Sequence, residues 1–231
     1  MTESNTSNKK KVLIYTLMVL IILSLNYIIA QGFDKIYLNN PNYKRTLQMH
    51  KNYKIKQADI IFLGNSITHG TNWNELLGRS NVVERAIPGD ILQGFLARVK
   101  TITDLKPKIC FVMGGVNDIF AGLQFDFILK DYYKLIRILK RNKIKVVIQA
   151  VVYAGKNYPN SGIKNLEIKK FNLKLHNYSE KNNFDFIDLN PVLCKDGFLK
   201  NKYTIDGIHF NWRAYKIWAK KIERVLKKYN L

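Results

Sequence analysis

Hydrophobic positions are grouped in short strand-like runs that alternate with longer segments of helical spacing. Four apolar runs of β-type residues cover 59–63, 108–113, 145–152 and 184–189, and a weaker run covers 82–87. Helical spacing is found near 91–104, 124–142, 162–181 and 211–228. Almost wholly apolar strands that alternate with helices are typical of a parallel sheet covered on both faces. The pattern therefore predicts an α/β fold with three layers.

The N-terminal part has a different pattern. Residues 1–11 are polar and end in three lysines, whereas residues 12–30 carry no charge. An uncharged helix of roughly 20 residues can cross a bilayer, and lysines before it stay in the cytoplasm. We therefore expect a cytoplasmic tail, a transmembrane signal-anchor helix over 12–30 and a domain outside the cytoplasm. A signal peptide cleaved near Ala30 is the alternative, and it would release a secreted domain.

The rest of the chain is expected to form one domain. Residues 31–57 are polar and aromatic, with paired asparagines before Pro41, and they are interpreted as a juxtamembrane tether. Residues 58–231 then contain all the alternating strands and helices. With 231 residues, of which 47% are hydrophobic, the chain is long enough for one well-buried domain and short for two.

The formal net charge of +21 bears on possible partners. Nucleic-acid binding proteins cluster their basic residues, but here lysines are spread over every segment, for example Lys134, Lys140 and Lys143. No nucleic-acid partner is expected. A general attraction to anionic lipid or acidic polysaccharide is compatible with this charge.

Cysteine and histidine positions do not suggest a metal site. Cys110 lies in a strand-like run and Cys194 in a loop-like run, and their spacing neither requires nor excludes a disulfide. No His, Cys and Asp cluster has metal-ligand spacing, so neither a metal nor another cofactor is expected. His69 could line a pocket but fits a surface position better, and His176 falls on a polar helix face.

The first apolar run ends abruptly at a serine, in the stretch IIFLGNSITHG of residues 60–70. Ligand sites of open α/β sheets form at the carboxyl ends of the strands, and Ser66 follows such an end. Gly64 permits a tight turn there. A helix that begins at this point would aim its first N–H groups at the same place. A simpler explanation is that Ser66 or Thr68 only caps that helix.

Three further stretches place polar residues after later strands. RAIPGD puts Gly89 beyond the second strand, MGGVND puts Asn117 beyond the third, and DGIH puts Asp206 and His209 after the last. Each alone could be an ordinary turn, helix start or surface residue. Together they would meet at one end of the sheet. A nucleophile, a histidine with a carboxylate, and amide donors are the groups that acyl transfer requires.

The stretches FLGNSIT, IPGD, GGVND and DGIHFN resemble the four sequence blocks of the SGNH hydrolases, also called GDSL esterases and lipases. Their order and spacing match, and the resemblance covers about residues 58–228. It implies a flavodoxin-like fold with a five-stranded parallel sheet. It also implies that Ser66 is the nucleophile and that Asp206 and His209 complete the triad. Ser66, Gly89 and Asn117 would then form the oxyanion hole.

Two details qualify the resemblance. The usual aspartate before the serine is Asn65 in this chain; because that position is not the triad acid, we expect catalysis to persist with altered local hydrogen bonding. The stretch RAIPGDILQGFLARV resembles the acetylhydrolase branch, which removes short acyl groups.

These features favour a membrane-anchored serine esterase outside the cytoplasm that hydrolyses carboxylic esters. Its substrates would be short acyl esters of a carbohydrate or lipid. One alternative is an O-acyltransferase that uses the same site to acylate a hydroxyl of a cell-surface glycan. Another is a binding module without catalysis, which would have no physical need for the complete set of catalytic groups.

Overall fold

The computed structural model describes residues 14–21 and 35–231, and the chain divides into two units, Met1–Ile36 and Tyr37–Leu231. Residues 14–21 are helical, with exposed side chains. Among the described residues, no helix combines the length and the apolar character needed to cross a membrane. The predicted tail over 1–11 and most of the predicted span over 12–30 lie outside the described residues, so the anchor remains a prediction.

The second unit is built on a parallel sheet of five strands in the order β2-β1-β3-β4-β5. The strands are β1 (Ile60–Gly64), β2 (Val82–Ala86), β3 (Ile109–Val112), β4 (Lys145–Gln149) and β5 (Asp185–Ile187). All four neighbouring pairs are parallel. This confirms the predicted α/β class and the five-stranded parallel sheet, and the strand order is that of flavodoxin-like folds.

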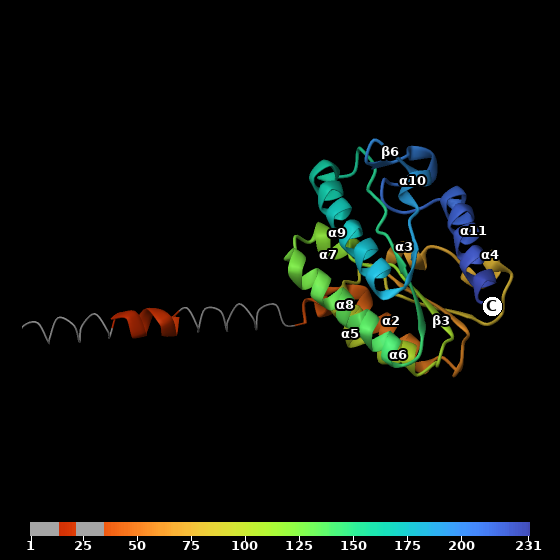
Figure 1. Cartoon of the computed structure of the whole chain (residues 1–231), viewed down its shortest axis with the longest axis horizontal. Helices are drawn as coiled ribbons and strands as arrows, with labels where there is room; N and C mark the ends of the chain where they lie inside the picture. Colours follow the sequence, from red (N-terminus) through yellow and green to blue (C-terminus); the bar gives the residue numbers. More distant parts are fainter. Residues whose placement is uncertain (1–13, 22–34) are drawn as a thin grey trace, which may run out of the picture. The chain divides into compact units, whose positions relative to one another are not determined.

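Helices cover both faces of the sheet (Figure 1). The longer ones are α2 (Pro41–Asn52), α8 (Phe125–Arg141), α9 (Ser161–Asn182) and α11 (Trp212–Lys228). Shorter ones are α3 (Ser66–His69), α4 (Trp73–Leu77), α5 (Leu92–Ala97), α6 (Lys100–Thr103), α7 (Val116–Phe120) and α10 (Asn190–Leu193). Two 3-10 turns, η1 (Ile36–Asn39) and η2 (Asn201–Tyr203), and a small hairpin of β6 (Cys194–Lys195) and β7 (Phe198–Leu199) complete the unit. Helix α4 contacts α11, while α5 contacts α8.

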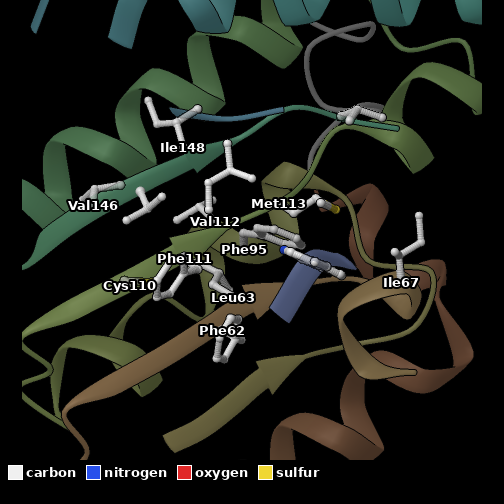
Figure 2. Packing of buried hydrophobic residues seen from close by; sticks show 14 of the residues in the cluster. Phe62, Leu63, Ile67, Phe95, Cys110, Phe111, Val112, Met113, Val146 and Ile148 are labelled. Atoms are coloured by element: carbon white, nitrogen blue, oxygen red, sulfur yellow. The ribbon is translucent and has the colours of Figure 1, made fainter. Parts of the chain in front are cut away.

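The core lies between the sheet and its helices. Every residue of β1 and β3 is buried, as expected for strands covered on both faces. The Phe62 ring stacks on Trp73 at 4.0 Å, and Trp73 meets Trp218 edge-on at 4.8 Å. Figure 2 shows side chains of β1, β3 and β4 packed with Phe95 of α5 and Ile67 of α3. This packing fixes the positions at which the strands end.

Two predicted elements differ in detail. The helical segment near 91–104 is divided into α5 and α6, because Arg98 leaves helical geometry (φ −111°, ψ 10°) and its side chain is fully buried. Strand β4 ends at Gln149 and not at residue 152. Beyond it, the Asn172 side chain accepts a hydrogen bond from Val151 N and donates one to Val151 O, which replaces a neighbouring strand.

The segment predicted as a tether, 31–57, is partly folded. The compact unit begins at Tyr37, and α2 follows with Asn40 as its N-cap and Pro41 in its first turn. Tyr43 is buried and its hydroxyl donates to Gly94 O at 3.2 Å. The domain therefore includes residues well before position 58.

Helix α2 also buries a histidine. His50 is 8% exposed, and its Nδ1 has no hydrogen-bond partner among the described residues. Burial, together with the nearby positive charges of Arg85 and Arg98, lowers the pKa of His50 from 6.5 to about 3. The folded protein therefore keeps this ring neutral at pH values where the unfolded chain protonates it. Folding stability should be lost as the pH falls below about 6.5.

We predict that His50→Gln makes stability less dependent on pH. One pKa unit corresponds to about 1.4 kcal/mol, so the parent should lose roughly 2 kcal/mol relative to the variant between about pH 7 and about pH 5. Urea unfolding at both pH values measures this difference. His176→Gln, at an exposed histidine, is the control and should leave the parental pH dependence in place. Parallel curves for the parent and His50→Gln would contradict the prediction.

Candidate active site

The site begins where β1 ends. Asn65 caps α3 by accepting a hydrogen bond from Ile67 N at 3.1 Å, and Ser66 is the first residue of that helix. A Cβ at Gly64 would collide with the Thr68 side chain, so only glycine lets the helix begin this close to the strand. Asn65 Nδ2 is buried and has no partner among the described residues. The asparagine in place of the family's aspartate therefore keeps the cap.

Three predicted residues meet in one line of hydrogen bonds. His209 Nε2 lies 2.9 Å from Ser66 Oγ, and His209 Nδ1 lies 2.5 Å from Asp206 Oδ2. With the ring proton on Nδ1, held by the carboxylate, Nε2 is left as the acceptor for the serine hydroxyl. Ser66 and His209 are half-buried, while Asp206 is exposed. The arrangement has the geometry of an activated serine nucleophile.

The loop that carries Asp206 and His209 is held by its own hydrogen bonds. Asp206 Oδ1 accepts from His209 N at 2.7 Å and from Ile208 N at 2.9 Å. The Thr204 hydroxyl donates to His209 O at 2.7 Å, and Gly207 O accepts from Gly155 N at 2.6 Å. The carboxylate and the imidazole are thus fixed relative to each other before any substrate binds.

These hydrogen bonds also set the charge of Asp206. Burial acts to raise its pKa, but the hydrogen bonds from the His209 ring, His209 N and Ile208 N together hold the pKa of Asp206 below its usual value. The carboxylate is therefore ionised at neutral pH. It can stabilise a positive charge on the imidazole when His209 takes up a proton.

The candidate oxyanion donors follow neighbouring strands. Gly89 comes after β2 and Asn117 after β3, on either side of β1 in the sheet order. Asn117 Nδ2 donates to Asp90 O at 2.8 Å, which joins the two loops. An amide nitrogen carries two hydrogens, so one remains for a ligand. Within the part of the chain that the structure describes, Gly89 N–H donates to no protein acceptor.

Two buried carboxyl groups, Asp90 and Asp118, lie next to these donors in the sequence. The Arg98 guanidinium donates to Asp90 Oδ2 at 2.7 Å, and both side chains are fully buried. Asp118 accepts from Leu92 N through both carboxylate oxygens, at 3.0 and 3.3 Å. Burial raises the pKa of Asp118 to about 7, against the effect of the Leu92 N–H. Both carboxyl groups are adjacent in sequence to a candidate oxyanion donor.

The other candidate residues lie apart from this arrangement. His69 is exposed, and its Nδ1 lies 2.7 Å from Glu84 Oε1 on β2. His176 is exposed, and its Nδ1 lies 3.6 Å from Glu180 Oε2. Cys110 and Cys194 are free thiols, the first of them buried in β3. None of the four contacts Ser66 or His209 through a hydrogen bond.

Sequence reasoning did not identify several residues that support the site. Asp90 and Asp118 belong to the quoted stretches IPGD and GGVND but received no role, and neither did Arg98, which lies in the quoted stretch RAIPGDILQGFLARV. Asn40 was placed in the tether, although it donates to Pro88 O at 2.9 Å, next to Gly89. The Asn-Pro pair at 40–41 was the available signal, because asparagine followed by proline is typical of a helix start.

Comparison with known proteins identifies the family of this chain. The model of the GDSL-like lipase/acylhydrolase family matches residues 62–217, which is more than half of the chain. The chain therefore belongs to that family, and its structural neighbours are GDSL/SGNH hydrolases. The family and its esterase neighbours support ester hydrolysis as the general class of activity.

Three relatives of this chain are 17–34% identical to it. A GDSL-like lipase from Bacteroides thetaiotaomicron is 25% identical, with a TM-score of 0.70 over 81% of this chain and 98% of the other. An acetylxylan esterase from Geobacillus stearothermophilus, solved as a catalytic mutant, is 17% identical, with a TM-score of 0.61 over 74% and 95%. An N-acylneuraminate cytidylyltransferase from Streptococcus agalactiae serotype III is 34% identical over 83% of this chain. The chain spans only 42% of that relative's length.

The hydrogen-bonded line predicts that Asp206 and His209 act as one unit. His209→Ala removes the base, so kcat/KM should fall by roughly a thousandfold or more. Asp206→Asn removes the carboxylate that holds the ring proton on Nδ1, so its loss should be equal or smaller. The double variant should be little worse than His209→Ala alone.

The measurement is kcat/KM of both single variants and the double variant on one activated ester. Asp196→Asn, at an exposed loop position, is the control for removal of a carboxylate and should behave as the parent. If the losses of the two single variants multiply in the double variant, the residues act independently and the unit does not exist.

Proposed function

We propose that this protein is a serine esterase in which Ser66 attacks carboxylic esters with His209 as its base. The observation that carries the proposal is the contact of 2.9 Å between Ser66 Oγ and His209 Nε2, continued by the contact of 2.5 Å to Asp206. A serine hydroxyl is a weak nucleophile unless a base removes its proton during attack. This arrangement supplies the base and the group that orients it.

The reaction would proceed in two halves. Ser66 Oγ bonds to the ester carbonyl carbon while its proton passes to His209 Nε2. The alcohol then leaves with that proton, and the acyl group stays on Ser66. Water, deprotonated by His209, attacks the acyl-serine, and the carboxylic acid is released as Ser66 regains its proton. Asp206 stays ionised throughout and stabilises the protonated ring.

Each half passes through a tetrahedral intermediate with a negative oxygen. The backbone N–H groups of Ser66 and Gly89 and the free hydrogen of Asn117 Nδ2 are the proposed donors to this oxygen. Loss of one such donor typically costs roughly 100- to 1,000-fold in rate. The bond from Asn117 to Asp90 O supports this role, because it fixes the amide in advance.

The proposed substrates are short acyl esters of a carbohydrate or lipid. The acetylxylan esterase relative is named for an acetylated polysaccharide, whereas the N-acyl group in the name of the Streptococcus relative is an amide and does not bear on the ester. The charge of +21 favours an anionic substrate or an anionic surface. The cytidylyltransferase activity in the second name belongs to a much longer protein and is not part of the proposal.

The proposed location is the outer face of a membrane, with residues 12–30 as the anchor. Lys9, Lys10 and Lys11 before an uncharged segment support this orientation.

We predict that Ser66→Ala lowers hydrolysis of nitrophenyl acetate by at least roughly a thousandfold, with an unchanged thermal midpoint. The full-length protein in detergent is compared with Ser80→Ala, which removes an exposed hydroxyl and should keep full activity. The parent should also prefer the acetyl ester to the octanoyl ester. Near-parental turnover by Ser66→Ala would refute the nucleophile.

The proposed location predicts that a reporter fused after Leu231 is active only outside the cytoplasm. Alkaline phosphatase, which needs an oxidising compartment, should be active in this fusion. Replacing the three lysines by glutamate should reduce that activity, because the charge bias that sets the orientation is removed. Recovery of the intact protein in the soluble cytoplasmic fraction would contradict both the anchor and the export.

A further inference from the structure

The loop after β2 is a tight turn that presents Gly89. Asp90 N donates to Ile87 O at 3.1 Å, Pro88 is the second residue of the turn, and Gly89 has φ +76°. A turn with proline at its second position and a positive φ at its third position is a type II turn. The Pro88–Gly89 peptide is therefore the central peptide of the turn, and it carries both Pro88 C=O and Gly89 N–H.

The direction of this peptide is not fixed by the turn's own hydrogen bond. Type I and type II turns share the bond from the fourth residue to the first and differ mainly by a half rotation of the central peptide. Such a rotation would exchange the faces to which Pro88 C=O and Gly89 N–H point. Since Gly89 is a glycine, φ on either side of zero is accessible to it. Proline followed by glycine already favours the type II direction, and a group outside the turn that bonds Pro88 O would hold the peptide in that direction.

That group is Asn40, the N-cap of α2. Its Nδ2 donates to Pro88 O at 2.9 Å, and a Cβ built at Gly89 would lie 3.3 Å from the same nitrogen. We propose that Asn40 is a positioning residue, which holds the Pro88–Gly89 peptide so that Gly89 N–H faces the oxyanion. This inference rests on the proposed esterase function and adds to it a residue that precedes the whole sheet.

The cap and the donor functions of Asn40 use different atoms. Its Oδ1 accepts from Asn42 N at 3.0 Å and begins the helix, whereas Nδ2, among the described residues, donates to Pro88 O alone. Serine is as good a cap as asparagine, but its hydroxyl lies on Cβ and cannot extend as far as Nδ2 does. Asn40→Ser therefore keeps the cap and removes the donor without adding charge.

Asn42 supplies a weaker second contact. Its Nδ2 lies 3.4 Å from Pro88 O. When Asn40 is changed, this contact should still hold the Pro88–Gly89 peptide in the productive direction in part of the molecules. Asn40→Ser alone should lower kcat by roughly tenfold. The double variant with Asn42→Ala should approach the roughly 100-fold loss typical of a missing oxyanion donor. KM should stay within about twofold, because ground-state binding does not use the oxyanion contact.

The experiment compares the parent, Asn40→Ser, Asn40→Ala and the double variant on nitrophenyl acetate. Inhibition by phenylboronic acid, which forms a tetrahedral adduct with an active serine, should weaken in parallel with kcat. Asn52→Ser is the matched control, since Asn52 lies on the same helix and its side chain donates to Gln48 O at 2.8 Å, within that helix. A merely structural role would lower the thermal midpoint in Asn40→Ala and leave kcat of folded Asn40→Ser unchanged.

The results of this experiment distinguish the positioning role of Asn40 from the esterase function. Parental kcat and parental boronate affinity in folded Asn40→Ser and in the double variant would overturn the positioning role and leave the esterase in place. A parent without Ser66-dependent hydrolysis would overturn the esterase, and the positioning role with it. A fall in kcat with unchanged KM, weaker boronate binding and a parental Asn52→Ser supports both.

Discussion

The site depends most on the hydrogen bonds that the buried Arg98 guanidinium donates. It donates to Asp90 Oδ2 at 2.7 Å, to Arg85 O at 2.9 Å and to Gly64 O at 3.1 Å. The end of β1, the end of β2 and the turn that carries Gly89 therefore share one cation. Removing one partner of a buried ion pair costs about 3–5 kcal/mol, because the remaining charge is left uncompensated in the core. Separating the carboxyl ends of the two strands would break a hydrogen bond from this guanidinium to Gly64 O or to Arg85 O.

Other supports converge on the same turn from different directions. Asn117 in α7, which follows β3, donates to Asp90 O, and Asn40, the N-cap of α2, donates to Pro88 O. The loop that carries Asp206 and His209, in contrast, is held mainly by Thr204 and by the Asp206 carboxylate itself. The proposed oxyanion hole is thus fixed by parts of the chain that are far apart in sequence, whereas the proposed acid and base are held mainly by hydrogen bonds within residues 204–209. Catalysis benefits from such preorganisation, since donors placed in advance need no rearrangement during the reaction.

This difference explains what the sequence could predict. The strands were predictable because each is an almost continuous apolar run, and Asp206 and His209 were predictable because they lie three positions apart in one short motif. The roles of Arg98 and Asn40 depend on partners that only tertiary packing brings near. Arginine is almost never fully buried unless it is paired, and nothing local indicated the partners that allow the Arg98 side chain to be buried. Asn40 lies before the first strand, where polar composition favoured a tether and concealed a helix cap. Of the residues taken from the motif, Ser66, His209 and Asp206 lie in one line of hydrogen bonds, and their catalytic roles stay predictions.

Covalent labelling tests most directly whether Ser66 is an activated nucleophile. The full-length protein is treated with an alkyl fluorophosphonate, which reacts with serines that a neighbouring base activates, and the adduct is mapped by mass spectrometry after digestion. The account predicts one adduct per chain, on Ser66, and its loss in His209→Ala. An adduct on another residue, or an unlabelled Ser66 in folded protein, would contradict the account.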